Sequence, residues 1–313
     1  MPAARLIRIP TLDVSRHDDA PVGTLENLID FIDRHRRLLV LSGAGLSTRS
    51  GIPAYRDASG QWLRRDPILF QDFMRCEITR RRYWARSFFG WQLMQQANPN
   101  AAHRALARLE QAGRIHHLIT QNVDGLHRAA GSKRVIELHG RLAAVSCQAC
   151  GLALERDLLQ RRMENLNPDW QPEVLGYNPD GDAELDASAY PGFKVAACEA
   201  CGGALKPDVV FFGETVPGPR LQAVNQAIES SDAVLVIGSS LVVMSGYRIV
   251  RQARKLGLPV AAINDGRTRA DDLLDFKLGG DCVQLLSDAV EVLLSGIEPA
   301  SQSVRPAQAG HDN

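Results

Sequence analysis

The sequence lacks long apolar runs and a net charge of either sign. None of its apolar stretches approaches the roughly 18–20 residues that a membrane-spanning helix needs, and its N-terminal segment has no apolar core like that of a secretory signal. Lys plus Arg and Asp plus Glu both number 36, so the overall charge gives no reason to expect nucleic acid or an anionic membrane as a partner. We therefore expect a cytoplasmic monomer that binds neither nucleic acid nor membrane.

Cysteine is also scarce, with six residues in a chain of 313, which excludes a disulfide scaffold. Four of the six form two Cys-x-x-Cys pairs, Cys147 with Cys150 and Cys198 with Cys201. Four thiolates suit a tetrahedral Zn²⁺ ion and leave no open position for a substrate, so we predict one structural zinc site. A redox pair or chance spacing is the alternative. Basic and aromatic residues do not interleave around these cysteines, as they would in a nucleic-acid module.

The sequence also lacks the last glycine of a dinucleotide-binding fingerprint in LLVLSGAGLSTRSGIPAYRD, residues 38–57. An apolar run enters Gly43-Ala44-Gly45, as a strand enters a phosphate-binding turn. A dinucleotide fingerprint has another glycine three places later, where this chain has Thr48. No acidic residue ends a following strand to bind a ribose, so an ordinary dehydrogenase is disfavoured.

What is abundant is Val, Ile and Leu, in short segments separated by helix-like stretches. This pattern predicts an α/β fold, a Rossmann-like parallel sheet with helices on both faces. The expected strands are Leu38 to Ser42, His116 to Thr120, Arg134 to Leu138, Ala233 to Ile237 and Pro259 to Ile263.

Two segments interrupt this alternation and divide the chain. We expect a helical insertion at 57–100 and a zinc-binding module at 141–206, whose turn-rich centre, residues 167–186, suggests loops and short strands. The sheet domain then comprises 36–140 and 207–297. An N-terminal arm with the first helix occupies 1–35, and a disordered tail occupies 298–313.

The expected strands end in polar or glycine-bearing groups. Ligands of open α/β sheets bind outside the carboxyl ends of the strands, so these groups predict a single crevice. They are Gly43-Ala44-Gly45, Gln121-Asn122-Val123-Asp124, His139-Gly140, Gly238-Ser239-Ser240 and Asn264-Asp265-Gly266.

Within this crevice, His139 is a candidate general base, since the ordinary pKa of histidine is about 6.5. Gly238 and Ser239 are placed to approach phosphate, and Asn264 to hold a ribose. Taken singly, such strand-to-helix turns also occur for backbone geometry alone. The other two cysteines, Cys76 and Cys282, are expected to be buried small apolar residues.

Several motifs in order resemble the sirtuins, NAD-dependent protein deacylases. They are GAGLSTRSGIPAYRD, QNVDGLH, ELHG, the two Cys-x-x-Cys pairs, KPDVVFFGE, GSSL and IND, and they span about 38–286. RYWARSFFGW and NPDGD resemble class II, the branch that contains a mitochondrial sirtuin with lipoamidase and ADP-ribosyltransferase activities. After GSSL the chain reads VVMSGYR, where many deacetylases carry a proline, so their acyl and peptide preferences are not transferred.

The resemblance implies a role for each matching residue. His139 and Asn122 would be catalytic, His139 as the base that takes a proton from a ribose hydroxyl and Asn122 as the residue that orders ribose and water. Val210 and Phe211 would hold the acyl-lysine peptide as an added strand. The implied NAD contacts are Gly43, Ala44, Gly45, Thr48, Ile52, Pro53, Tyr55, Arg56, Gln121, Asn122, Asp124, Gly238, Ser239, Ser240, Asn264, Asp265, Gly266 and Cys282.

The implied reaction consumes NAD. Nicotinamide leaves the ribose, the acyl oxygen of acyl-lysine attacks, and His139 then activates a ribose hydroxyl, giving free lysine and O-acyl-ADP-ribose. Transfer of ADP-ribose to a protein side chain is the alternative reaction, and a non-enzymatic NAD sensor is disfavoured by the presence of His139, Asn122 and Asp124 together.

The acyl group is a separate question. Tyr83 and Arg86 have the Tyr-x-x-Arg spacing with which sirtuins that remove succinyl and malonyl groups bind the acyl carboxylate. The same residues would equally serve to pack the helical insertion.

Overall fold

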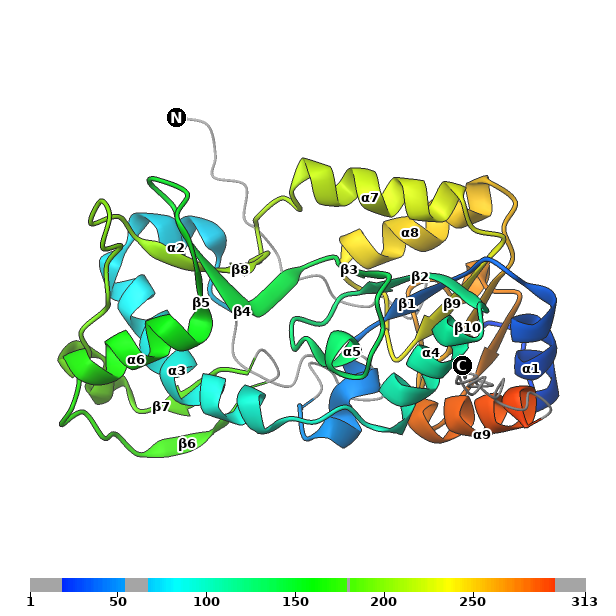
Figure 1. Ribbon diagram of the computed structural model, residues 1–313, viewed down its shortest axis with the longest axis horizontal. Coiled ribbons are helices and arrows are strands. Elements are labelled where there is room, and N and C mark those ends of the chain that lie inside the picture. The colour runs from blue at the N-terminus through cyan, green and yellow to red at the C-terminus, as the bar shows by residue number, and fades with distance from the viewer. Residues whose placement is uncertain (1–18, 54–66, 179–180, 296–313) are drawn as a thin grey trace, which may run out of the picture.

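The computed structural model describes residues 19–53, 67–178 and 181–295. The molecule is elongated, with a large part built on a parallel sheet at one end and a smaller part with α2, α3 and α6 at the other (Figure 1). No helix in the described ranges is both long and apolar enough to cross a membrane.

The large part contains a six-stranded sheet in the order β11-β10-β9-β1-β2-β3, and every pairing is parallel. The bounds are β1 Leu38–Ser42, β2 Ile115–Thr120, β3 Val135–Glu137, β9 Ala233–Ile237, β10 Val260–Ile263 and β11 Phe276–Leu278. The predicted α/β class and the five predicted strands are confirmed, with small differences at their ends. The edge strand β11 was not predicted, because three residues with Lys277 at their centre form no apolar run.

Helices cover both faces of this sheet (Figure 1). Leu38 and Val40 of β1 pack with α1 (Leu25–Arg34), α4 (Ala101–Gln111) and α9 (Cys282–Leu294). Leu39 and Leu41 point to the opposite face and pack with α7 (Gly218–Glu229) and α8 (Met244–Lys255). Since successive side chains of a strand alternate between faces, a continuously apolar strand is what a sheet covered on both faces requires.

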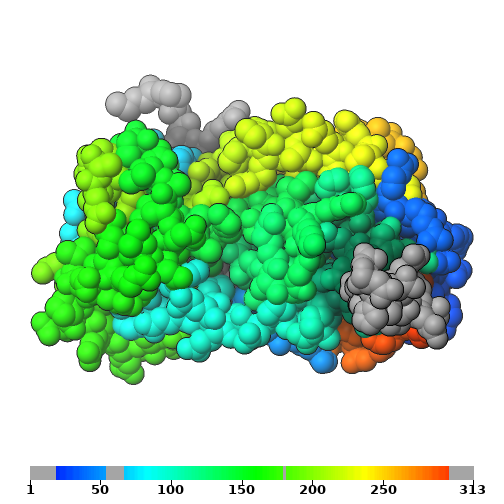
Figure 2. All heavy atoms as spheres, viewed as in Figure 1, coloured from blue at the N-terminus to red at the C-terminus, as the bar shows by residue number. Residues whose placement is uncertain are grey.

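The smaller part combines the helical insertion with the cysteine-bearing segment. It contains a three-stranded antiparallel sheet, β5-β4-β8, and a hairpin, β6-β7. The bounds are α2 Phe70–Arg75, α3 Glu77–Gln96, β4 Gly140–Cys147, β5 Ala153–Glu155, α6 Arg156–Leu166, β6 Val174–Tyr177, β7 Ala183–Leu185, η2 Ala187–Gly192 and β8 Leu205–Val209. Figure 2 shows the cyan atoms of the insertion against the green atoms of the cysteine-bearing segment.

The turn-rich centre of this segment, residues 167–186, contains the predicted short strands, β6 and β7. Helix α6, of 11 residues, lies just before it and was not predicted. Leu159 and Met163, one helical turn apart, are buried in the same aromatic-rich core as Trp84 and Phe88 of α3. The two interruptions therefore share one core, which neither segment's sequence indicates alone.

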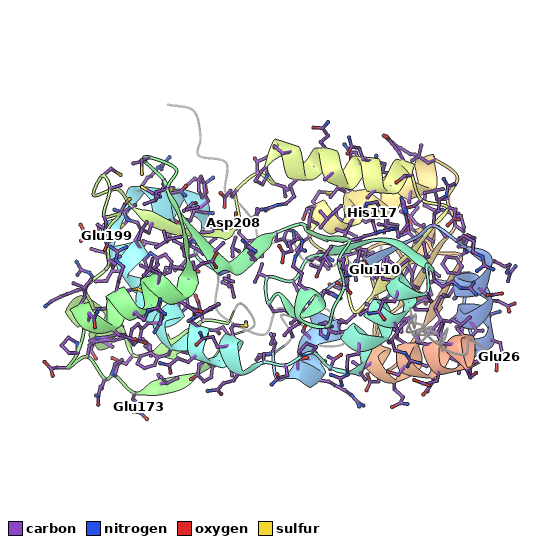
Figure 3. All side chains as sticks on the ribbon, in the orientation of Figure 1. Glu26, Glu110, His117, Glu173, Glu199 and Asp208 are labelled. Carbon is purple, nitrogen blue, oxygen red and sulfur yellow. The ribbon has the colours of Figure 1, made fainter. Side chains whose placement is uncertain are left out.

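The remaining short elements lie in the large part. They are η1 Ala44–Ser50, α5 Leu126–Ala129 and η3 Asp271–Leu273. The two parts meet at a contact between oppositely charged side chains. Asp208, labelled in Figure 3 near the junction, lies 3.4 Å from Nη2 of Arg220 on α7.

Candidate active site

A cleft of about 1030 Å³ opens at the carboxyl ends of β1, β2, β3, β9 and β10. It brings together residues from all five predicted strand ends. The predicted residues that line it are Gly43, Ala44, Gly45, Thr48, Gln121, Asn122, His139, Val210, Phe211, Gly238, Ser239, Ser240, Asn264, Asp265 and Cys282. Ile52, Pro53, Asp124 and Gly266 are not part of the lining that the described residues form. Tyr55 and Arg56 lie outside the described residues.

The floor of the cleft is a close contact between two glycine loops. The Gly45 N–H donates to the Gly238 carbonyl at 2.9 Å. A Cβ at Gly43 would lie 2.7 Å from that carbonyl oxygen, and a Cβ at Gly238 would lie 2.5 Å from the Leu46 nitrogen. Gly238 also has φ +60°, which side-chain-bearing residues rarely adopt. Both glycines are therefore required for the approach, which leaves bare backbone facing the cleft.

After the glycine loop the chain forms the 3₁₀ helix η1, Ala44–Ser50, instead of the long α-helix of a dinucleotide fingerprint. The Thr48 hydroxyl, which stands in place of a glycine, donates to the Gly45 carbonyl at 3.0 Å. The Cys282 thiol also points to that carbonyl, at 3.5 Å, and burial raises its pKa to about 11. Cys282 is therefore a buried, neutral packing contact under the loop, as expected, whereas Cys76 was expected to be buried and is only half-buried.

A hydrogen-bonded network ties the end of β2 to η1. The Asn122 side-chain amide donates to the Gly43 carbonyl at 3.1 Å and to the Ser47 hydroxyl at 3.0 Å. Ser47 in turn donates to the Asp124 carboxylate at 2.7 Å, whose other oxygen accepts from the Leu126 N–H at 2.9 Å. Burial raises the pKa of Asp124 above its usual range. The sequence predicted Asn122 and Asp124 but missed Ser47, because nothing local distinguishes one serine in a loop.

His139 is held between two groups. Its Nδ1 lies 3.0 Å from the Gln121 carbonyl oxygen, which can only accept, so Nδ1 carries the hydrogen. Its Nε2 therefore has a lone pair, and it lies 2.7 Å from the Ser245 hydroxyl. Burial is the main cause that lowers the pKa of His139 to about 4, with a smaller effect of the Arg220 charge. His139 is thus a neutral imidazole in one tautomer at neutral pH, as a base requires.

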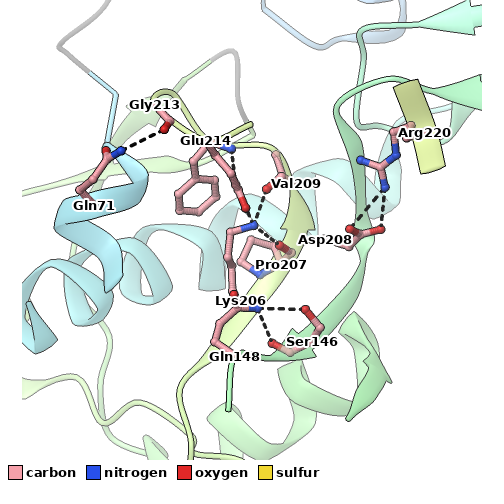
Figure 4. Close-up of polar contacts among 11 residues, drawn as sticks. Gln71, Ser146, Gln148, Lys206, Pro207, Asp208, Val209, Gly213, Glu214 and Arg220 are labelled. Carbon is pink, nitrogen blue, oxygen red and sulfur yellow. Dashed lines mark hydrogen bonds and ion pairs between the residues drawn. The ribbon is translucent and has the colours of Figure 1, made fainter. Parts of the chain in front are cut away.

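Beside His139, the segment after β8 forms one wall of the cleft, and Figure 4 shows what fixes it. The Val210 N–H donates to the His139 carbonyl at 2.9 Å. Glu214 Oε2 accepts from the Phe211 N–H at 2.8 Å and lies 3.0 Å from Nζ of Lys206. The same Nζ donates to the Val209 carbonyl at 2.6 Å. A nearly buried ion pair therefore fixes the backbone of this wall through hydrogen bonds.

Tyr83 and Arg86 lie in the core of the smaller part. Tyr83 is 7% exposed, and its ring contacts the ring of Phe211 at 5.2 Å between centroids. Arg86 is 9% exposed, donates to the Ala183 carbonyl at 3.1 Å and lies 3.8 Å from the Asp182 carboxylate. The described lining of the cleft includes neither Tyr83 nor Arg86.

The four paired cysteines converge at the tip of the three-stranded sheet. Their sulfur atoms all lie within 4.8 Å of one another, with 3.5 Å between Cys147 and Cys201 and 3.7 Å between Cys150 and Cys198. Tetrahedral zinc with Zn–S bonds of about 2.3 Å needs sulfurs about 3.8 Å apart, so the cluster fits the ion. Backbone N–H groups of Cys150 and Ala149 lower the pKa of the Cys147 thiol to about 6, toward the thiolate that binds metal.

Two further histidines lie behind the loop. His103 and His127 are buried with ring centroids 4.9 Å apart, and burial lowers their pKa values to about 4 and about 3. His127 Nε2 lies 2.8 Å from the Ser42 hydroxyl at the end of β1. They are neutral core residues, and neither belongs to the lining that the described residues give the cleft.

Comparisons with known proteins, by sequence and by fold, point to one protein family. The model of the Sir2 family matches residues 43–245. An NAD-dependent protein deacetylase of Bordetella bronchiseptica is 52% identical over 272 residues, covering 87% of this chain and 99% of the relative. The mitochondrial NAD-dependent protein lipoamidase sirtuin-4 of Bos taurus is 47% identical over 265 residues, covering 84% of each chain.

Solved structures agree. Sir2 with a p53 peptide and NAD⁺ has a TM-score of 0.69 and 29% identity, over 88% of this chain and all of that one. A Sir2 enzyme bound to a propionylated peptide has a TM-score of 0.68 and 28% identity over the same shares. The chain belongs to the Sir2 family, the sirtuins.

Proposed function

We propose that the protein is an NAD-dependent protein lysine deacylase that transfers the acyl group of acyl-lysine to ADP-ribose and releases nicotinamide. One observation carries this proposal. His139, neutral and fixed in one tautomer, stands in the cleft between the glycine loops and the backbone wall at Val210. The names of the deacetylase relatives support it.

The glycine floor fits the diphosphate of NAD. Gly43 and Gly238 pack so closely that no side chain fits between the two loops, so bare backbone faces the cleft and can approach phosphate oxygens. We assign Gly43, Ala44 and Gly45 to the diphosphate, and Asn264 to a ribose. Bound NAD would supply the electrophilic ribose carbon and the hydroxyl that becomes the acyl acceptor.

The nicotinamide end would lie over the network of Asn122, Ser47 and Asp124. Asn122 spans the Gly43 carbonyl and Ser47, so it is held rigidly where ribose and water would be ordered. We also propose Ile52 and Asp124 as contacts of the nicotinamide carboxamide. Fixed polar groups of this kind stabilise a developing cation without reorganising.

Acyl-lysine would enter along the wall formed by Val210 and Phe211. Lys206 and Glu214 hold that backbone from behind, so an extended peptide would meet a preformed edge. The Sir2 structures with p53 and propionylated peptides support a protein or peptide substrate. A cytoplasmic monomer stays our prediction for the protein as a whole.

Zinc is proposed as a structural ion. Cys147, Cys150, Cys198 and Cys201 would hold it with all four positions filled, away from the residues that line the cleft. Its role would be to order the strands β4 and β8, between which the cysteine pairs lie.

For the acyl group, the contacts favour the packing interpretation of Tyr83 and Arg86. The Arg86 guanidinium already contacts Asp182 and the Ala183 carbonyl, and Tyr83 packs among aromatic rings. We propose that neutral acyl groups are preferred to acyl groups with a terminal carboxylate.

The test is a panel of acetyl-, lipoyl- and succinyl-lysine peptides with ³²P-labelled NAD, comparing wild type with His139→Ala. We expect O-acyl-ADP-ribose from wild type and a loss of about 10²-fold or more in His139→Ala. Label that stays on protein would instead indicate ADP-ribosyl transfer, and no product from any peptide would contradict deacylation.

A further inference from the structure

The Ser245 hydroxyl occupies the catalytic lone pair of His139. The imidazole has one hydrogen, on Nδ1 and directed to the Gln121 carbonyl, so the 2.7 Å contact at Nε2 must be donated by Ser245. Nε2 has a single lone pair and accepts one hydrogen bond. A substrate hydroxyl therefore cannot reach Nε2 directly while this contact persists.

The position of Ser245 is set by the fold. It lies in the first turn of α8, lines the cleft and is half-buried. The next residue, Gly246, allows this turn to approach the β2 end, since a Cβ there would lie 2.5 Å from Oε1 of Gln121. Gln121 also supplies the carbonyl that orients His139, so one residue sets the base and its hydroxyl partner together.

Building on the proposed deacylase reaction, we propose that Ser245 is a proton relay between the substrate hydroxyl and His139. A serine hydroxyl can accept one proton while donating another, so it can stand between an acid and a base. A relay is also the one path by which His139 takes a proton without first losing the observed contact.

The step balances. Ser245 Oγ accepts the proton of the ribose hydroxyl as the Ser245 O–H bond breaks and a new N–H bond forms at Nε2. The serine hydroxyl is restored, the imidazole becomes imidazolium with Nδ1–H still on the Gln121 carbonyl, and the electron pair of the ribose O–H bond is left on the oxygen that attacks.

The experiment separates the two stages of the reaction in wild type, Ser245→Ala, Ser245→Thr and a matched control, Ser287→Ala. Ser287 is an equally half-buried serine on α9, whose hydroxyl donates to the Val283 carbonyl. Exchange of labelled nicotinamide into NAD reports the stage before the base acts, and O-acyl-ADP-ribose formation reports the stage that needs the base. Thermal unfolding checks that each variant folds.

A relay predicts that Ser245→Ala lowers kcat for acyl transfer by about tenfold or more, while nicotinamide exchange stays within about twofold. Ser245→Thr, which keeps the hydroxyl, should restore most of kcat, and Ser287→Ala should match wild type. In mixtures of H₂O and D₂O, the rate of wild type should curve with deuterium content, because two protons move together, and that of Ser245→Ala should be linear.

Three results would overturn the relay. An unchanged or faster kcat in Ser245→Ala would make the contact an inhibitory resting state. An equal loss of nicotinamide exchange and acyl transfer in that variant would make the contact structural. A linear dependence of the wild-type rate on deuterium content would show that two protons do not move together. Wild type that shows neither exchange nor transfer would instead refute the proposed deacylase function itself.

Discussion

The ion pair of Lys206 and Glu214 offers a sharp test of how the cleft wall is held. Lys206 is almost fully buried, and its Nζ meets three acceptors, the Val209 carbonyl at 2.6 Å, the Pro207 carbonyl at 3.3 Å and the Glu214 carboxylate at 3.0 Å. Lys206→Met removes the ammonium and keeps most of the apolar stem. The change leaves two carbonyls and one carboxylate without this partner.

The magnitude follows from those contacts. Leaving one buried acceptor unsatisfied costs about 1–3 kcal/mol, and removing one partner of a fully buried ion pair costs about 3–5 kcal/mol. The side chains of Lys206 and Glu214 are 6% and 20% exposed, so water can reach the carboxylate and repay part of the loss. We therefore expect Lys206→Met to lower the free energy of unfolding by about 2–3 kcal/mol, which is about 3–6 °C in Tm for a chain of this size.

The assay is a double-mutant cycle in urea with Lys206→Met, Glu214→Gln and the double variant, and the exposed Lys133→Met as the matched control. The coupling energy should be about 1–3 kcal/mol, and the control should change stability by less than about 0.5 kcal/mol. Because the Glu214 carboxylate also accepts from the Phe211 N–H, Glu214→Gln should raise the KM for acyl peptide while the KM for NAD stays near wild type. A coupling energy near zero, or a loss of stability in Lys206→Met no larger than that of the control, would contradict the role of this ion pair in holding the wall.

Three further predictions concern zinc, pH and the acyl group. Mass spectrometry under native conditions should find one zinc per chain in wild type and none in Cys150→Ala, with a Tm lower by about 5 °C or more; a metal-free wild type would contradict the site. His103 and His127 have pKa values of about 4 and about 3 when folded and about 6.5 when unfolded, so their contribution to stability should be full above pH 6.5 and fall by a few kcal/mol as the pH drops toward 4. His127→Gln should flatten that fall in urea titrations, and an unchanged slope would contradict the assignment. Arg86→Met should lower stability by about 2–3 kcal/mol, since it breaks a buried contact with Asp182, and leave the ratio of succinyl to acetyl activity unchanged; a tenfold drop in that ratio would restore the carboxylate role.

Local patterns in the sequence predicted the sheet well, because strands buried on both faces must be apolar throughout. The five strands with an apolar run were found, and the edge strand β11, with Lys277 at its centre, was missed. Helix α6 was missed because proline- and glycine-rich stretches next to it suggested loops, and the buried side of α6 is defined by α3 rather than by its own neighbours.

The sequence by itself determined which chemical groups were available and much of where they would meet. The spacing of the cysteines predicted that the four thiols meet in one cluster. The rule that ligands bind at the carboxyl ends of parallel strands placed Gly43, Asn122 and His139 in one cleft. These inferences succeed because spacing and strand polarity are local properties of a chain.

Only the tertiary structure decided what each group touches. The hydroxyl of Ser245 meets His139 across 106 positions of sequence, and Arg86 contacts the Ala183 carbonyl across 97. No local pattern encodes such contacts, since they depend on how helices pack on the sheet and on which polar groups burial leaves to be satisfied. The same packing partly buries His139, which lowers its pKa and keeps it neutral, so the state of the base is a property of the fold.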